Sequence, residues 1–125
     1  MKIFLVLISS AVLLLSNSDC SSKSKEGTTY KGRLEIKAIC SNYTISVLEG
    51  NMDTSRIVAN WTDENTGKSY TNVFKLGSPC NFPSTINQGD EFFFTIDTAT
   101  QKDCIVCMAY YPVPPKVIPI IVQEN

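Results

Sequence analysis

The chain has 125 residues, no histidine and nearly balanced charge, with 11 basic and 12 acidic side chains and a formal net charge of −1. Without histidine there is no Ser-His-Asp or Cys-His catalytic arrangement and no histidine-ligated zinc, so we expect a non-enzymatic protein without cofactor or metal. The two kinds of charge are mixed along the chain and form no basic patch, so nucleic-acid binding is not expected.

The N-terminus has the features of a signal peptide. Lys2 precedes an apolar segment at residues 3–15, which has the length of a signal h-region. This segment is too short to cross a bilayer as a helix, which needs about 20 residues. We therefore expect residues 1–19 to be a signal peptide, residues 20–29 a flexible Ser/Lys tether and residues 30–125 one β domain.

Cys20 stands apart from the other four cysteines, directly after the expected signal peptide. Disulfides use cysteines in pairs, so an exported protein with five has one thiol that needs another role. Cleavage before Cys20 by a lipoprotein signal peptidase would leave this thiol acylated, as with palmitate, and anchor the protein in a membrane. Cleavage after Ser18 would instead release a secreted protein. Asp19 favours secretion, whereas the cysteine count and the tether favour lipidation.

The other four cysteines are expected to form two disulfides in an oxidising compartment. Cys104 and Cys107 are three residues apart on one expected strand, so their side chains point to opposite faces and each should pair elsewhere. Two pairings remain, and of these we take Cys40 with Cys107 and Cys80 with Cys104.

After residue 29 the chain reads as short strands separated by turns, with no amphipathic helix of useful length. Turns are expected at 63–68, where Gly67 suits the positive φ of a bulged hairpin, and at 87–90. The expected strands are residues 33–40, 43–48, 57–61, 70–76, 91–97, 105–111 and 117–122. About seven antiparallel strands indicate an all-β domain, either a small sandwich, which we favour, or a partly open OB-like barrel.

Two strands carry further information about their place in the sheet. In the strand at 91–97, Phe92 and Phe94 share one face and Phe93 has the other, which predicts a central strand covered on both faces. In the strand at 117–122, Pro119 cannot donate a hydrogen bond to a neighbour. This strand is therefore expected at an edge or with a bulge.

Tyr110 and Tyr111 are the best candidates for a binding surface. They are consecutive on an expected strand, so one should face the core and the other the solvent. The outward tyrosine lies beside the proline-rich turn at 112–115 and could contact a protein or carbohydrate partner.

The Cys104-x-x-Cys107 spacing is also that of thioredoxin-type redox motifs. Redox chemistry needs the motif at a helix N-terminus, where the pKa of the thiol is lowered, and here a strand-like segment follows. A thiol oxidoreductase that uses Cys104 and Cys107 is therefore the least favoured function.

Several segments resemble small lipoproteins of the Bacteroidota. They are the signal with residues 20–23, the loop at 77–83, the strand start at 89–92 and the ending at 104–112. No activity is assigned to that family, so the resemblance implies localisation and fold class and no functional residues.

We expect a membrane-tethered lipoprotein with a non-enzymatic binding or accessory role in the cell envelope, anchored at the outer membrane or the cell surface. The alternative is a secreted binding module or inhibitor that presents the loop at 79–83 or 112–115 to a partner.

Overall fold

The computed structural model describes residues 27–101 and 104–124. The expected signal peptide, Cys20 and most of the expected tether lie outside these residues. Three short 3-10 turns are present in the described chain, namely η1 (Ile39–Ser41), η2 (Thr54–Arg56) and η3 (Pro79–Asn81). The strands are β1 (Tyr30–Lys37), β2 (Tyr43–Glu49), β3 (Val58–Thr62), β4 (Ser69–Leu76), β5 (Glu91–Ile96), β6 (Val117–Ile118) and β7 (Ile120–Val122).

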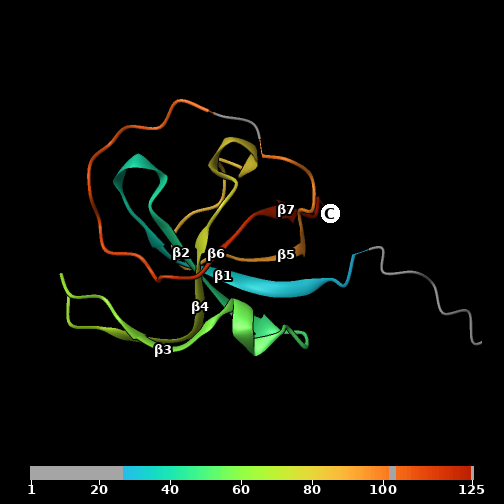
Figure 1. Cartoon of the computed structure of the whole chain (residues 1–125), viewed down its shortest axis with the longest axis horizontal. Helices are drawn as coiled ribbons and strands as arrows, with labels where there is room; N and C mark the ends of the chain where they lie inside the picture. The colour runs from blue at the N-terminus through green and yellow to red at the C-terminus, as the bar shows by residue number, and fades with distance from the viewer. Residues whose placement is uncertain (1–26, 102–103, 125) are drawn as a thin grey trace, which may run out of the picture.

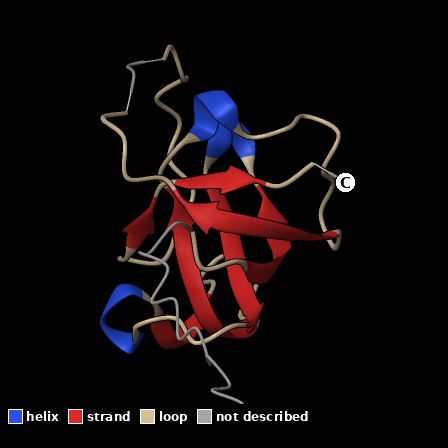
Figure 2. Ribbon diagram, turned by 90° about the vertical axis from the view of Figure 1, so that its right-hand side faces the viewer, coloured by secondary structure: helices blue, strands red, loops and turns tan. Residues whose placement is uncertain are grey.

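The strands of the described chain form one seven-stranded sheet in the order β3-β4-β2-β1-β5-β7, with β6 paired to β4. The β4–β6 pair is parallel and the other pairs are antiparallel. The expected all-β class is therefore confirmed. The strands belong to one sheet rather than two, and this sheet is not closed into a barrel (Figures 1 and 2).

The sheet is strongly curved around a single core. The rings of Phe74 in β4 and Phe94 in β5 lie 5.8 Å apart between centroids. In the sheet, β2 and β1 lie between these two strands, so a flat sheet would separate them by about 14 Å. The curvature brings together one cluster of buried side chains, which consists of Tyr30, Leu34, Ile45, Met52, Phe74, Leu76, Phe92, Phe94, Ile118 and Ile120.

The first strand alternates between buried and partly exposed side chains and ends earlier than expected. Leu34 and Ile36 are buried on the core face of β1. The strand ends at Lys37, so the expectation that it continues to residue 40 is wrong. The chain instead turns through η1, where Cys40 has a left-handed φ of 57°.

The turn at 63–68 forms the expected hairpin between β3 and β4. The Gly67 amide donates to the Asp63 carbonyl (2.7 Å), and the Asp63 amide donates to the Lys68 carbonyl (2.9 Å). Gly67 has the expected positive φ, 72°. The turn at 87–90 is also present, because the Asp90 amide donates to the Asn87 carbonyl (3.0 Å).

Strand β5 lies between β1 and β7, but it is covered on one face only. Phe94 is fully buried, whereas Phe93 remains 43% exposed, so the prediction of cover on both faces is wrong. The Nζ of Lys31 lies 5.8 Å from the centroid of the Phe93 ring, within the range of a cation–π contact. A charged side chain thus takes the place of a second apolar layer.

Pro119 divides the expected last strand into β6 and β7, which pair with different neighbours. Ser78 bridges the interruption, because its buried hydroxyl donates to the Ile120 carbonyl and accepts from the Ile120 amide, both at 2.8 Å. The two backbone segments around Gly77 and Pro119 approach so closely that a Cβ on Gly77 would lie 2.8 Å from the Pro119 nitrogen. Glycine is therefore required at residue 77.

The expected strand at 105–111 is not formed, and this prediction is wrong. Ile105 and Val106 favour strands by propensity, but the cysteines on either side tie this segment to connections outside the sheet. The covalent constraint overrides the local preference.

Replacing Phe94 with alanine should lower the free energy of unfolding by about 3–5 kcal/mol, because the substitution opens a cavity in the core. The matched control is Phe93→Ala in the same strand, which should cost about 1 kcal/mol or less because that ring is partly exposed. Urea denaturation measures both variants. Equal losses would contradict the assignment of core and outer faces in β5.

Candidate binding site on the disulfide-anchored strap

Residues 104–111 form an extended segment that we call the strap. Figure 1 shows it, in orange, arching away from the sheet, past η3 and the connection between β1 and β2. Its backbone makes no backbone–backbone hydrogen bond with another described residue. Side chains and disulfides therefore hold the strap in place.

Two disulfides attach the strap to the body. Cys104 is bonded to Cys80 in η3, and Cys107 is bonded to Cys40 in η1, with Cα–Cα distances of 5.8 and 4.8 Å. This is the pairing expected from the sequence, and both distances are usual for disulfides. Because each cysteine of the Cys-x-x-Cys motif bonds elsewhere, the two do not form a redox pair with each other.

The strap ends on the β3–β4 hairpin. The Tyr111 hydroxyl donates to Asp63 Oδ2 (2.8 Å), and the Tyr110 hydroxyl donates to Glu64 Oε1 (3.0 Å). Asp63 is almost fully buried, and its Oδ1 accepts from the Asn65 amide (2.9 Å). A buried carboxylate needs such partners, so Asp63 fixes both the hairpin turn and the end of the strap.

These hydrogen bonds raise the pKa of both tyrosines. The hydrogen bond to Glu64 raises the pKa of Tyr110, and the nearby negative charge adds to the effect. The hydrogen bond to Asp63 raises the pKa of Tyr111, followed by desolvation and the charge of the same carboxylate. Both hydroxyls therefore keep their protons at neutral pH and remain donors.

The middle of the strap is held from η1 on both sides of Met108. Cys107 is bonded to Cys40, and the Asn42 side-chain amide donates to the carbonyls of Ala109 and Ile39, both at 3.0 Å. At this turn, Cys40 and Ser41 both have a left-handed φ of 57°. A non-glycine residue in that conformation is strained and persists because the surroundings fix it.

The strap carries apolar side chains that the fold leaves in solvent. Ile105 is 104% exposed, Met108 93% and Tyr110 77%, whereas Tyr111 is only partly exposed. Tyr110 is thus the more exposed of the two tyrosines, of which the sequence predicted that one would face the solvent without indicating which. Behind the strap, next to β4 and β6, lies a hollow of about 460 Å³ that is lined in part by Lys75, Val106 and Met108.

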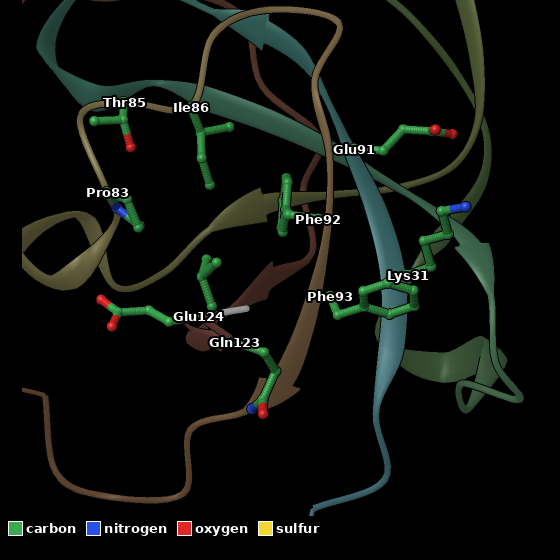
Figure 3. A pocket seen from close by; sticks show the side chains of 10 residues that line it. Lys31, Pro83, Thr85, Ile86, Glu91, Phe92, Phe93, Gln123 and Glu124 are labelled. Atoms are coloured by element: carbon green, nitrogen blue, oxygen red, sulfur yellow. The ribbon is translucent and has the colours of Figure 1, made fainter.

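A second hollow, of about 360 Å³, lies on the outer side of β5 (Figure 3). Phe93 and Ile86 contribute apolar surface to it, and Lys31 and Glu91 stand at its rim. The Glu91 carboxylate is 3.2 Å from the Arg33 guanidinium, and Lys31 Nζ is 3.8 Å from Glu49. The rim charges are therefore already matched within the fold, which makes this hollow a weaker candidate than the strap.

The proline-rich loops differ in accessibility. In the segment 112–115, Pro112 and Pro114 are buried and Pro115 is exposed. Pro79 and Pro83 are both partly exposed. Because two of the three prolines in the segment 112–115 are buried, the exposed surface next to Tyr110 is formed by the strap rather than by residues 112–115.

No family model, curated protein or solved structure matches this chain. Within residues 27–101 and 104–124, no group of three or more acidic, cysteine or histidine side chains could hold a metal ion. In the same part of the chain, no helix is long and apolar enough to cross a bilayer. The site is therefore interpreted from its own geometry.

Sequence reasoning identified the cysteines and tyrosines of this site but missed the residues that hold the strap. Asn42, Asp63 and Glu64 contact the strap across separations of 46 to 67 residues. Asn42 stands two residues after a disulfide cysteine, which is the one local signal that could have indicated its role. Met108 gave no signal, because an apolar residue in an expected strand is usually a core residue.

Removing the Cys40–Cys107 bridge with alanines should lower the free energy of unfolding by about 4.4 kcal/mol, and removing Cys80–Cys104 by about 3.4 kcal/mol. These values follow from the loop entropy of bridges that span 67 and 24 residues. Urea unfolding of the two double variants measures the difference. A larger loss for the shorter bridge would contradict the account of the two bridges by loop entropy.

The contribution of the Tyr111–Asp63 hydrogen bond should depend on pH. Because the folded protein raises the pKa of Tyr111, the contribution is fully present below the unfolded pKa, about 10, and is lost as pH rises through the folded value. The difference in melting temperature between the unmodified protein and Tyr111→Phe should thus be constant near neutral pH and shrink in strong alkali. A difference that grows with alkaline pH would contradict the direction of this shift.

Proposed function

We propose that this chain is a non-enzymatic, lipid-anchored binding module of the cell envelope, and that the strap is its binding surface. Two disulfides in a small β domain fit a protein that is exported to an oxidising compartment. The observation that carries the proposal is the strap itself, in which apolar side chains are held in solvent by two covalent bridges.

The cysteine arithmetic supports lipidation. Cys40, Cys80, Cys104 and Cys107 are used in disulfides, which leaves Cys20 as the fifth. An acylated Cys20 would hold the domain near a membrane, firmly if two or more acyl chains are attached. The resemblance to Bacteroidota lipoproteins agrees with this anchoring. The alternative is secretion after cleavage at Ser18.

The exposed strap supports a binding role. Large apolar side chains in water forgo the stabilisation that burial would give, about 1.5–3 kcal/mol for a side chain such as methionine. Ile105 and Met108 lie near each other in sequence and are both fully exposed. Large apolar side chains exposed on one short segment support a role as a protein interaction site.

The thiol oxidoreductase alternative has less support. A thioredoxin-type reaction needs the two cysteines of the motif to bond to each other, whereas Cys104 and Cys107 are bonded to Cys80 and Cys40. The motif also lies in an extended segment rather than at a helix N-terminus.

Intact-mass analysis of the protein purified from its membrane fraction should show an acyl-sized increment on the N-terminal fragment that begins at Cys20. Cys20→Ala should remove this increment and shift the protein to the soluble fraction, since the anchor is lost. A mature protein that begins at Asp19 without an increment would contradict lipid anchoring and support secretion.

A photo-crosslinking residue at Met108 should form adducts with the partner in intact cells. The matched control is the same residue at Thr54, which is exposed in η2 at the opposite end of the molecule (Figure 1). Adducts from position 108 that are absent from position 54, and absent when Cys40 and Cys107 are replaced, would assign binding to the strap. Equal adducts from both positions would contradict this assignment.

A further inference from the structure

We propose that residues 107–110 mimic a bound peptide substrate and occupy the active-site cleft of an endopeptidase, with Met108 in its specificity pocket. The protein would then act as an inhibitor of an enzyme that accepts unbranched apolar side chains. This inference rests on the proposed binding role of the strap and names the class of its partner.

The backbone of the strap suits an endopeptidase cleft. Endopeptidase clefts hold an extended segment by backbone hydrogen bonds, as in strand addition, and accept one side chain in a pocket. The strap has no helix or strand and runs as an open arch (Figure 1), and its amides and carbonyls make no backbone–backbone bond to other described residues. Apart from the Ala109 carbonyl, which accepts from Asn42, it thus offers the groups that a cleft would bind.

Met108 lies between two residues that are anchored to the body. It is 93% exposed, and the residues on either side of it are fixed to one turn of the body. Cys107 is bonded to Cys40. The Ala109 carbonyl accepts a hydrogen bond from the side chain of Asn42, which lies two residues after Cys40 in the sequence. The methionine side chain is therefore presented on a backbone whose conformation is set before binding, which lowers the entropic cost of association.

Met108 suits this role better than Ile105, the other fully exposed apolar residue of the strap. Methionine is unbranched and flexible, so it can enter a narrow pocket, whereas isoleucine is branched at Cβ. Ile105 also follows one anchored residue, Cys104, and is followed by Val106 rather than by a second anchored residue.

A segment anchored on both sides of the reactive bond would inhibit the enzyme rather than be consumed as a substrate. Hydrolysis of the Met108–Ala109 bond adds one water and gives a carboxylate on Met108 and an amine on Ala109. The first new end stays attached through Cys107 to Cys40. The second is held by Asn42 and by the contacts of Tyr110 and Tyr111 with the hairpin. The ends cannot separate, so the bond can re-form in the cleft and the enzyme stays occupied.

The test uses chymotrypsin, whose specificity pocket is a hydrophobic slot, and trypsin, whose pocket holds an aspartate. The disulfide-bonded protein should inhibit chymotrypsin and leave trypsin active. Met108→Lys should weaken inhibition of chymotrypsin by about 30-fold or more, the scale of a hot-spot residue, and create inhibition of trypsin. Ile105→Lys is the matched control and should change neither specificity. Urea unfolding should be similar for both variants, because both side chains are exposed.

Asn42 has a positioning role that a second variant tests. Asn42→Ala should still bind chymotrypsin at first, but mass spectrometry should show faster cleavage between Met108 and Ala109 and recovery of enzyme activity. Loss of stability alone would weaken inhibition without directing cleavage to this bond. Cleavage of Asn42→Ala at other bonds, or no increase in cleavage, would overturn this role.

The outcomes separate the inference from the function on which it rests. Strap-specific crosslinking from position 108 without inhibition of chymotrypsin would overturn the inhibitor and leave the binding module standing. No strap-specific crosslinking and no inhibition would overturn both. Sedimentation with lipid vesicles that Met108→Asp abolishes, without inhibition, would assign the strap to a membrane surface and overturn the endopeptidase.

Discussion

The packing of Phe94 against Phe74 holds in contact two strands that the sheet order separates by two others. Tyr30 and Phe92 also pack on Phe94, with ring centroids at 5.6 and 5.9 Å. Because these rings meet, the sheet curves, and its curvature places η1 and η3 where the strap can reach them. The disulfides depend on this placement, since a bridge forms only when the two Cα atoms lie within about 7 Å.

The core and the bridges stabilise different parts of the chain. Apolar burial fixes β1, β2, β4 and β5, whereas the strap is attached by disulfides and by hydrogen bonds to Asn42, Asp63 and Glu64. Pro119 separates the last two strands, because β6 ends directly before it and β7 begins directly after it. The hydroxyl of Ser78 supplies the hydrogen bonds that the broken strand lacks there. A domain of about 100 residues can thus carry a long segment outside its sheet.

Local patterns predicted much of this fold. The all-β class and the positive φ of Gly67 followed from residue type and spacing. For the cysteines, spacing excluded only the pairing of Cys104 with Cys107 and left two alternatives, of which the structure has Cys40–Cys107 with Cys80–Cys104. The failures arose where distant residues decide the outcome. The segment at 105–111 has strand propensity, but covalent bonds to η1 and η3 remove it from the sheet. Phe93 lacks a second apolar layer because Lys31 covers part of its ring, and no local pattern indicates that pairing.

The strap is informative because its sequence and its position disagree. A segment that contains Ile105, Val106 and Met108 would be expected to collapse onto the apolar parts of the hollow behind it, since burial favours such side chains by kilocalories. The two bridges and the Asn42 hydrogen bond keep Ile105 and Met108 in water instead. Their exposure lowers the free energy of unfolding of the free protein, because burial of these side chains would stabilise it. A partner that covers the same side chains would gain this burial energy on binding. Because the backbone is already fixed, little conformational entropy remains to be lost on binding, so more of the burial energy appears as affinity.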